Sequence, residues 1–93
     1  MKIEHVLISP IIADKVLYKH GVRATEVKDV LLHQNVYIEK VRDNRYMAIG
    51  KIQRGFVTVF FDYYSSGVVE LVSARFSNAR EKRKYKRKIK GGT

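Results

Sequence analysis

The sequence predicts an α+β domain in which helices precede and follow an antiparallel sheet. Three observations lead to this class: helical apolar spacing in the first third, strand-like alternation in the middle, and a last helix rich in lysine and arginine. The chain has 93 residues, 45% of them hydrophobic, so one modest core is expected. We therefore expect residues 1–93 to form a single domain, with residues 91–93 as a flexible tail.

Two helices are predicted before the sheet. Ser9 can cap free amide groups, and Pro10 suits the first helical position because it has no N–H to satisfy. Gly21 can take the left-handed conformation that ends a helix, so the first helix should span residues 10–20. A second helix is predicted for residues 25–34, where apolar side chains recur every three or four positions.

Four strands are predicted in the middle of the chain, at residues 36–42, 45–52, 56–64 and 68–75. Short polar or glycine-containing turns separate these segments, and such short links require antiparallel neighbours. The third strand is apolar on both faces from Phe56 to Phe61, whereas the others alternate. We therefore place the third strand in the centre of the sheet and expect the others to be half exposed.

The last helix carries most of the charge of the protein. Asn78 and Glu81 have the spacing of a capping box, which predicts a helix from there to Gly91 and Gly92. Eight of the eleven residues from 80 to 90 are Lys or Arg and one is Glu, so this segment contributes +7 of the +10 formal charge. Like charges four positions apart destabilise a helix by about 0.2–0.5 kcal/mol per pair. We therefore favour a polyanion-binding surface over charge that serves solubility alone.

Several kinds of site are excluded by the composition. There is no cysteine, so neither a disulfide nor a thiolate metal site is possible, and the three histidines lack metal-ligand spacing. The glycine-rich phosphate loop and the nucleophile elbow are both absent. No apolar run is long enough to span a bilayer and the N-terminus lacks signal-peptide features, so we expect a cytoplasmic protein without membrane contact. Any catalysis should use Arg, Lys, Tyr and His without a metal or a small-molecule cofactor.

Arg75 is the most specific candidate for chemistry. It ends a strand whose alternate residues, counted back to Val69, are expected to face the core, and it lies just before the N-terminus of the last helix. An arginine in this place can hold a phosphate or stabilise charge in a transition state. The alternative is a structural ion pair with Glu26 or Asp29.

Four other residues have weaker arguments. Tyr85 can anchor the last helix on the sheet, or its hydroxyl, surrounded by cations, can exchange a proton or bind phosphate. His20 lies at a helix end and is the histidine best placed to reach a cleft, while His33 supports no prediction. Lys51 and Arg54 add cations in the predicted hairpin.

An ordered set of short motifs resembles the BrnT-type toxins, which are small ribonucleases of bacterial type II toxin–antitoxin pairs with a RelE-like fold. The motifs are Lys19-His20-Gly21-Val22, Arg45-Tyr46-Met47-Ala48-Ile49-Gly50-Lys51, Val72-Ser73-Ala74-Arg75 and Glu81-Lys82-Arg83-Lys84-Tyr85. The resemblance spans about residues 19–88. The chain departs from the family in its first helix, where Ile12 and Val16 stand in place of the family's polar residues.

The resemblance implies a RelE-like fold and metal-free cleavage of mRNA, in which a ribose 2′-hydroxyl attacks the adjacent phosphate, and thereby inhibition of translation. It also implies a cognate antitoxin protein that covers the basic surface. The candidate catalytic residues are Arg75, His20, Tyr85 and Lys51, and the candidate RNA-binding residues are Lys19, Arg54, Arg80, Arg83, Lys84 and Arg87. On charge alone, a non-catalytic RNA- or DNA-binding module and a protein that docks an acidic partner stay open.

Overall fold

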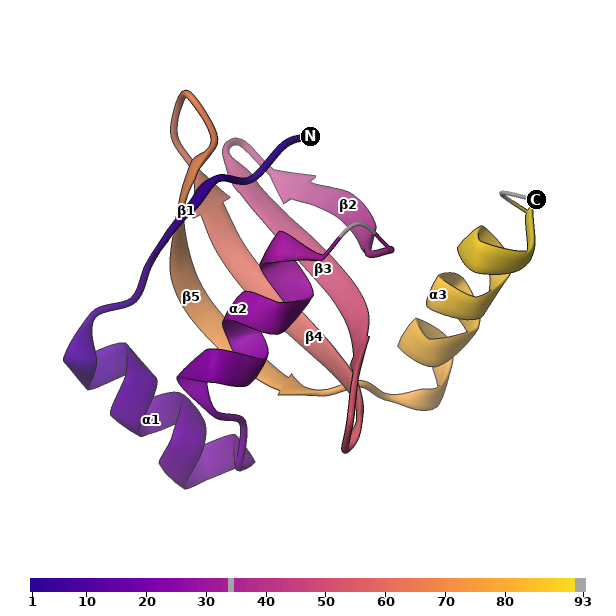
Figure 1. Ribbon diagram of the computed structural model, residues 1–93, viewed down its shortest axis with the longest axis horizontal. Helices are drawn as coiled ribbons and strands as arrows, with labels where there is room; N and C mark the ends of the chain where they lie inside the picture. The colour runs from indigo at the N-terminus through magenta and orange to yellow at the C-terminus, as the bar shows by residue number, and fades with distance from the viewer. Residues whose placement is uncertain (34, 92–93) are drawn as a thin grey trace.

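The structure is a computed structural model that describes residues 1–33 and 35–91. Its elements are β1 (His5–Leu7), α1 (Pro10–His20), α2 (Ala24–Leu32), β2 (Tyr37–Arg42), β3 (Arg45–Ile52), β4 (Gly55–Tyr63), β5 (Val68–Phe76) and α3 (Ala79–Gly91) (Figure 1). The fold is α+β, and every predicted helix and strand is present within one or two residues of its predicted bounds. No helix among the described residues is long and apolar enough to cross a membrane.

The sheet has five strands in the order β1-β5-β4-β3-β2. The four predicted strands pair in sequence order as antiparallel neighbours, β2 with β3, β3 with β4 and β4 with β5, as predicted. The predicted central place of β4 is also confirmed. The prediction of a purely antiparallel, four-stranded sheet is wrong, because β1 pairs in parallel with β5. The strand β1 has only three residues, too few to show an alternating pattern in the sequence. It is positioned instead by the amides of Glu4 and His5, which donate to the carbonyl of Gly67 at 2.8 and 3.1 Å.

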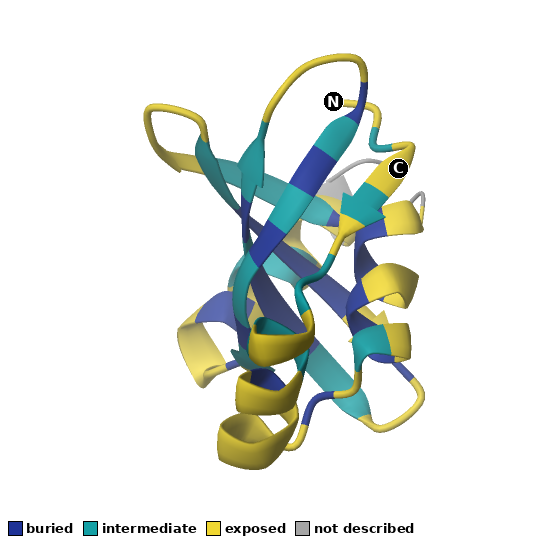
Figure 2. Cartoon of the chain, turned by 90° about the vertical axis from the view of Figure 1, so that its left-hand side faces the viewer, coloured by how far each residue is buried: buried dark blue, intermediate teal, exposed yellow. Residues whose placement is uncertain are grey.

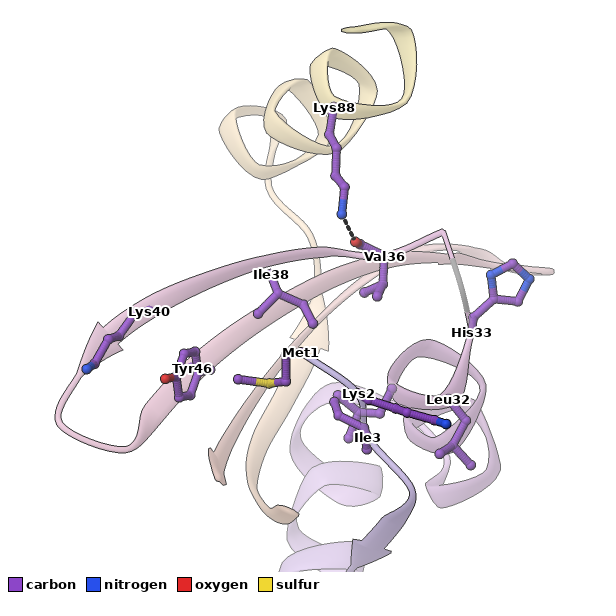
Figure 3. Close-up of a pocket in the computed structure, with 11 residues that line it drawn as sticks. Met1, Lys2, Ile3, Leu32, His33, Val36, Ile38, Lys40, Tyr46 and Lys88 are labelled. Atoms are coloured by element: carbon purple, nitrogen blue, oxygen red, sulfur yellow. Dashed lines mark hydrogen bonds between the residues drawn. The ribbon is translucent and has the colours of Figure 1, made fainter. Parts of the chain in front are cut away.

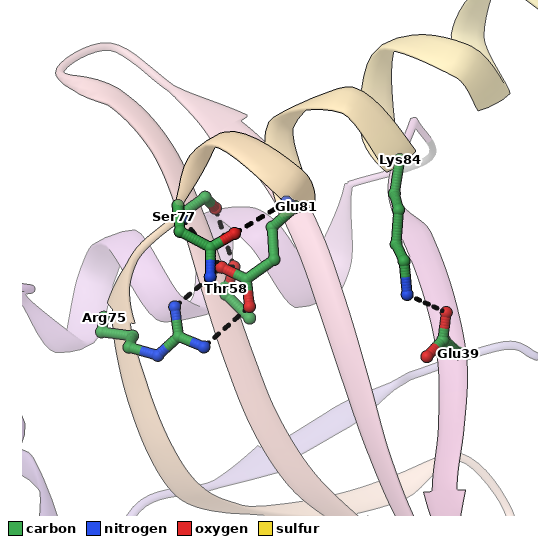
Figure 4. A network of polar contacts seen from close by, with 7 residues as sticks. Glu39, Thr58, Arg75, Ser77, Glu81 and Lys84 are labelled. Carbon is green, nitrogen blue, oxygen red and sulfur yellow. Dashed lines mark hydrogen bonds and ion pairs between the residues drawn. The ribbon is translucent and has the colours of Figure 1, made fainter.

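Helices cover both faces of the sheet. On one face α1 and α2 bury the main apolar core, in which Val16 and Val27 pack with Val59 and Phe61 of β4. On the other face α3 crosses the sheet, as the view in Figure 4 makes plain. The outward sides of the helices are exposed while the central strands are buried (Figure 2).

The ends of α1 follow the predicted local signals. The hydroxyl of Ser9 accepts the amide of Ile12 at 3.2 Å, and Gly21 takes a left-handed φ of 69° while its amide donates to Leu17. Helix α2 ends at Leu32, two residues before the predicted end, and residue 34 lies outside the described residues. At the C-terminus residue 91 closes α3, and the rest of the predicted tail, residues 92–93, also lies outside them.

A β-bulge in β5 changes which way its last residues point. Phe60 of β4 pairs with Ser73 and its neighbour Phe61 pairs with Leu71, so Val72 is one residue more than the pairing needs. The alternation of side chains therefore reverses at this point, and Ala74 faces the main core. Arg75 consequently points to the α3 face, and the prediction that it ends a core-facing row is wrong.

Candidate nucleic-acid interface on the α3 face

The N-terminus of α3 is built as the sequence predicts. The side-chain oxygen of Asn78 accepts the amide of Glu81 at 2.9 Å, and a carboxylate oxygen of Glu81 accepts the amide of Asn78 at 2.9 Å. This reciprocal pair satisfies two amides that a helix start would otherwise leave unpaired. It also turns the Glu81 carboxylate inward, toward β4 and β5.

The Glu81 carboxylate accepts four hydrogen bonds, one from the Asn78 amide and three from residues of the sheet. Its two carboxylate oxygens accept one bond each from the two terminal nitrogens of Arg75, both at 2.7 Å, and Thr58 donates a further bond at 2.9 Å (Figure 4). The hydroxyl oxygen of Thr58 also lies 2.7 Å from the hydroxyl oxygen of Ser77, within hydrogen-bonding distance. Burial alone would raise the pKa of Glu81, but the bonds from Arg75, the Asn78 amide and Thr58 outweigh it and hold that pKa below its ordinary value. Glu81 is therefore a carboxylate that fixes the position of α3.

Arg75 forms a structural ion pair, but its partner is neither of the two carboxylates considered from the sequence. It lies across from Thr58 on the α3 face, and its guanidinium is 5.5 Å from the centre of the Phe60 ring. The expected alternatives, Glu26 and Asp29, belong to α2 on the opposite face. Both terminal nitrogens of Arg75 donate hydrogen bonds to Glu81, so the main structural role of Arg75 is to hold the N-terminal turn of α3 against the sheet.

Most of the cations on α3 are not used in holding the helix. Lys84 donates to Glu39 of β2 at 2.9 Å, and Lys88 donates to the carbonyl of Val36. Among the described side chains, the exposed cations that form no ion pair on this helix are Arg80, Lys82, Arg83, Lys86, Arg87 and Lys88. This row of charge is exposed, as a polyanion-binding surface would require, and its binding of a polyanion stays a prediction.

A cleft of about 490 Å³ opens where α3 passes the ends of α2 and β3. Its lining residues are Asp29, His33, Asn35, Lys51, Ile52, Gln53 and Tyr85. The ring of Tyr85 packs edge-on against Phe56 with centres 5.5 Å apart, which confirms its predicted packing role. Two of the candidate catalytic residues, Lys51 and Tyr85, therefore lie in one cleft.

The other candidate residues lie elsewhere. His20 and Lys19 are exposed at the end of α1, on the face opposite α3, and neither lines the cleft. Arg54 bonds to both carboxylate oxygens of Glu26 at 2.6 and 2.8 Å and to the carbonyl of Gly21 at 2.7 Å. The hydrogen bonds of Arg54 lower the pKa of Glu26 to about 2. Arg54 therefore ties the β3–β4 hairpin to the junction of α1 and α2.

His33 is the cleft residue that the sequence did not indicate. It caps the C-terminal end of α2, and its Nδ1 accepts the amide of Asn35 at 3.1 Å. This bond leaves the ring's Nε2 as the atom that carries the proton of a neutral imidazole. His33 is relevant only because the fold brings this helix end into the same cleft as Lys51 and Tyr85, and no sequence pattern reports that proximity. No group of three or more His, Asp or Glu side chains in the described parts of the chain could hold a metal ion.

Comparison with known proteins supports the predicted resemblance. No protein-family profile and no curated protein sequence matches the chain. The crystal structure of the Brucella abortus ribonuclease toxin BrnT superposes with a TM-score of 0.64 and 21% sequence identity, over 84% of this chain and 97% of that one. This chain has the BrnT fold. The similarity to BrnT holds even though the sequences have diverged, so it concerns the arrangement of the elements rather than individual site residues.

Proposed function

We propose that this protein is a metal-independent endoribonuclease that cleaves mRNA, acting as the toxin of a type II toxin–antitoxin pair. The observation that carries the proposal is the cleft in which Lys51, Tyr85 and His33 converge beside the unpaired cations of α3. The fold shared with a ribonuclease toxin supports the same reading. A cognate antitoxin that covers the basic face belongs to the proposal.

The cations of α3 bind the RNA backbone in this proposal. Arg80, Arg83 and Arg87 are exposed and form no ion pair within the described residues, so each is available to a phosphate. Each neutralised phosphate of a single strand contributes about −0.7 to the slope of log K against log salt. Binding should therefore weaken steeply as the salt concentration rises.

The cleft supplies the groups for cleavage. The ribose 2′-oxygen attacks the adjacent phosphorus as the bond to the 5′-oxygen breaks, which leaves a 2′,3′-cyclic phosphate and a 5′-hydroxyl. Asp29, the one carboxyl side chain among the described residues that line the cleft, takes the proton of the 2′-hydroxyl. Tyr85 donates a proton to the leaving 5′-oxygen, while Lys51 and the Nε2–H of His33 stabilise the negative charge on the phosphate. Arg75 acts as a positioning residue, because it holds the helix that carries Tyr85.

Cleavage of a 5′-labelled RNA in the presence of EDTA tests the proposal. We expect products that end in a cyclic phosphate, and a loss of about 10²–10⁴-fold in rate for Tyr85→Phe if the phenol is the general acid. Tyr18→Phe is the matched control, since Tyr18 is 92% exposed on α1, far from the cleft in the fold. Expression should arrest growth, and co-expression of the antitoxin should restore it.

Two outcomes would contradict this function. Folded protein that leaves RNA intact would rule out the nuclease, and cleavage that EDTA abolishes would rule out metal independence.

The unpaired cations of α3 also favour a second candidate, a non-catalytic nucleic-acid-binding module. That module would bind RNA with the same steep salt dependence and yield no product.

A further inference from the structure

The sheet ends at β2, and the two sides of this edge differ in chemistry. Strand β2 pairs with β3 alone, so one side of its backbone has no neighbouring strand among the described residues. On the face of α1 and α2, a cavity of about 640 Å³ opens beside the strand (Figure 3). On the face of α3, a smaller hollow of about 240 Å³ is lined by Tyr37, Lys84, Arg87 and Lys88.

The larger cavity has an apolar floor and a cationic rim. Ile38 and Tyr46 form part of the floor, and Leu32, which is 50% exposed, lies at its margin (Figure 3). Lys2 and Lys40 lie on the rim, and none of the described lining residues is acidic. The cavity exists because α2 covers β3 and β4 but does not extend over β2.

We propose that an extended segment of a partner protein, with apolar side chains alternating with carboxylates, adds to the sheet along β2. Successive side chains of a strand point to opposite faces, so the apolar ones enter the larger cavity and the carboxylates meet the cations of the smaller hollow. The backbone of residues 37–40 supplies the hydrogen bonds. Glu39 does not oppose this arrangement, because it is already bonded to Lys84 and to the hydroxyl of Tyr37.

The same edge is unsuited to a second copy of this chain. A register shift between Lys40 and Arg42 ends regular pairing there, so no more than a short segment can add. Antiparallel addition of a second β2 would also place the α3 helices of both copies on the same face of the joined sheet, where the cations of one helix would face Lys84 and Arg87 of the other, and like charges facing each other are destabilising. An acidic partner avoids this repulsion.

The β2 edge is the surface that the antitoxin of the proposed function would occupy. The inference rests on the proposed function only in naming the bound partner as an antitoxin. The binding itself does not depend on RNA cleavage. Binding and cleavage can therefore be measured separately on the same preparations, so that failure of one is distinguishable from failure of the other.

The test uses a labelled peptide of alternating leucine and glutamate and a control peptide of the same composition arranged in two blocks. Fluorescence polarisation should show at least about tenfold weaker binding of the block peptide, since it cannot place its leucines in the cavity as a strand. Hydrogen exchange should show that the alternating peptide protects amides within residues 37–40, which adhesion to α3 alone would not do.

Two matched pairs of variants locate the contact. Leu32→Glu should weaken binding about tenfold, whereas Leu17→Glu, at 51% exposure on α1, should leave it unchanged. Arg87→Glu should weaken it, while Lys82→Glu makes the same charge change on an exposed position of α3 outside the hollow. Equal binding of both peptides, unprotected β2 amides, or equal effects within each pair would overturn the proposal. So would dimerisation through β2.

Discussion

Replacing Arg75 by alanine tests whether the contact between α3 and the sheet is structural, as its geometry indicates. The substitution removes two of the four hydrogen bonds that the Glu81 carboxylate accepts, and both are charge-assisted bonds of 2.7 Å. Glu81 is only 7% exposed, so water cannot fully replace the guanidinium. We therefore expect Arg75→Ala to destabilise the protein rather than to act on catalysis alone.

The magnitude follows from the burial of the two partners. Removing one member of a fully buried ion pair costs about 3–5 kcal/mol because a charge is left without compensation. The Arg75 side chain is 35% exposed, so solvent screening reduces this, and we expect a loss of about 2–3 kcal/mol in the free energy of unfolding. For a domain of this size, that loss corresponds to a fall in Tm of about 10–15 °C.

Urea unfolding of Arg75→Ala, Glu81→Ala and the double variant is the assay. The double variant should be less destabilised than the sum of the single variants, because it leaves no unpaired charge, with a coupling energy of about 1.5–3 kcal/mol. Arg83→Ala is the control on the same helix, since Arg83 is exposed, and its change should stay within about 0.5 kcal/mol. Additive effects of the two single variants, or an Arg75→Ala protein as stable as the control, would refute the reasoning.

Two further predictions concern the other face of the sheet. The folded pKa of Glu26 is about 2, below its ordinary 4.5, so its pair with Arg54 stabilises the protein above pH 4.5 and loses this effect as the pH falls toward 2. Glu26→Gln should therefore be less stable than wild type at pH 7 and approach it at pH 2, as acid titration of the unfolding free energy would reveal; a constant difference would exclude the pair as the cause. Gly50→Ala should cost about 1–3 kcal/mol, because a Cβ there would lie 3.0 Å from Val30 of α2. Calorimetry of this variant and of Gly50→Ala/Val30→Ala checks the clash, which the smaller side chain should relieve.

Most of the secondary structure could be predicted because its signals are local. Asn78 and Glu81 satisfy each other's amides within one turn, so the start of α3 is determined by residues close in sequence. The apolar run from Phe56 to Phe61 identified the central strand, since only a strand covered on both faces tolerates it. By contrast β1 is three residues long and depends on the distant carbonyl of Gly67.

The site was harder to predict because it depends on tertiary contacts. One extra residue, Val72, reverses the direction of Arg75, and nothing in the alternation of β5 marks where the bulge falls. The sequence indicated Lys51 by its charge and Tyr85 by its place on the basic helix, whereas His33 enters the cleft only because the fold brings the end of α2 near Tyr85. The resemblance to the BrnT-type toxins predicted the fold, and the catalytic roles of Arg75 and His20 stay predictions.

The way in which α3 is attached has a consequence for how the molecule opens. The buried apolar residues of the described chain all precede α3, and the buried residue of α3 itself is the charged Glu81. Detaching the helix would therefore leave the main core intact while uncovering Met47 and Ile49, which lie beneath it on β3. The helix is thus a unit that can open below the free energy of global unfolding. An anion bound along its cations would reduce their mutual repulsion and hold that unit closed, so substrate and fold stability are linked through one element.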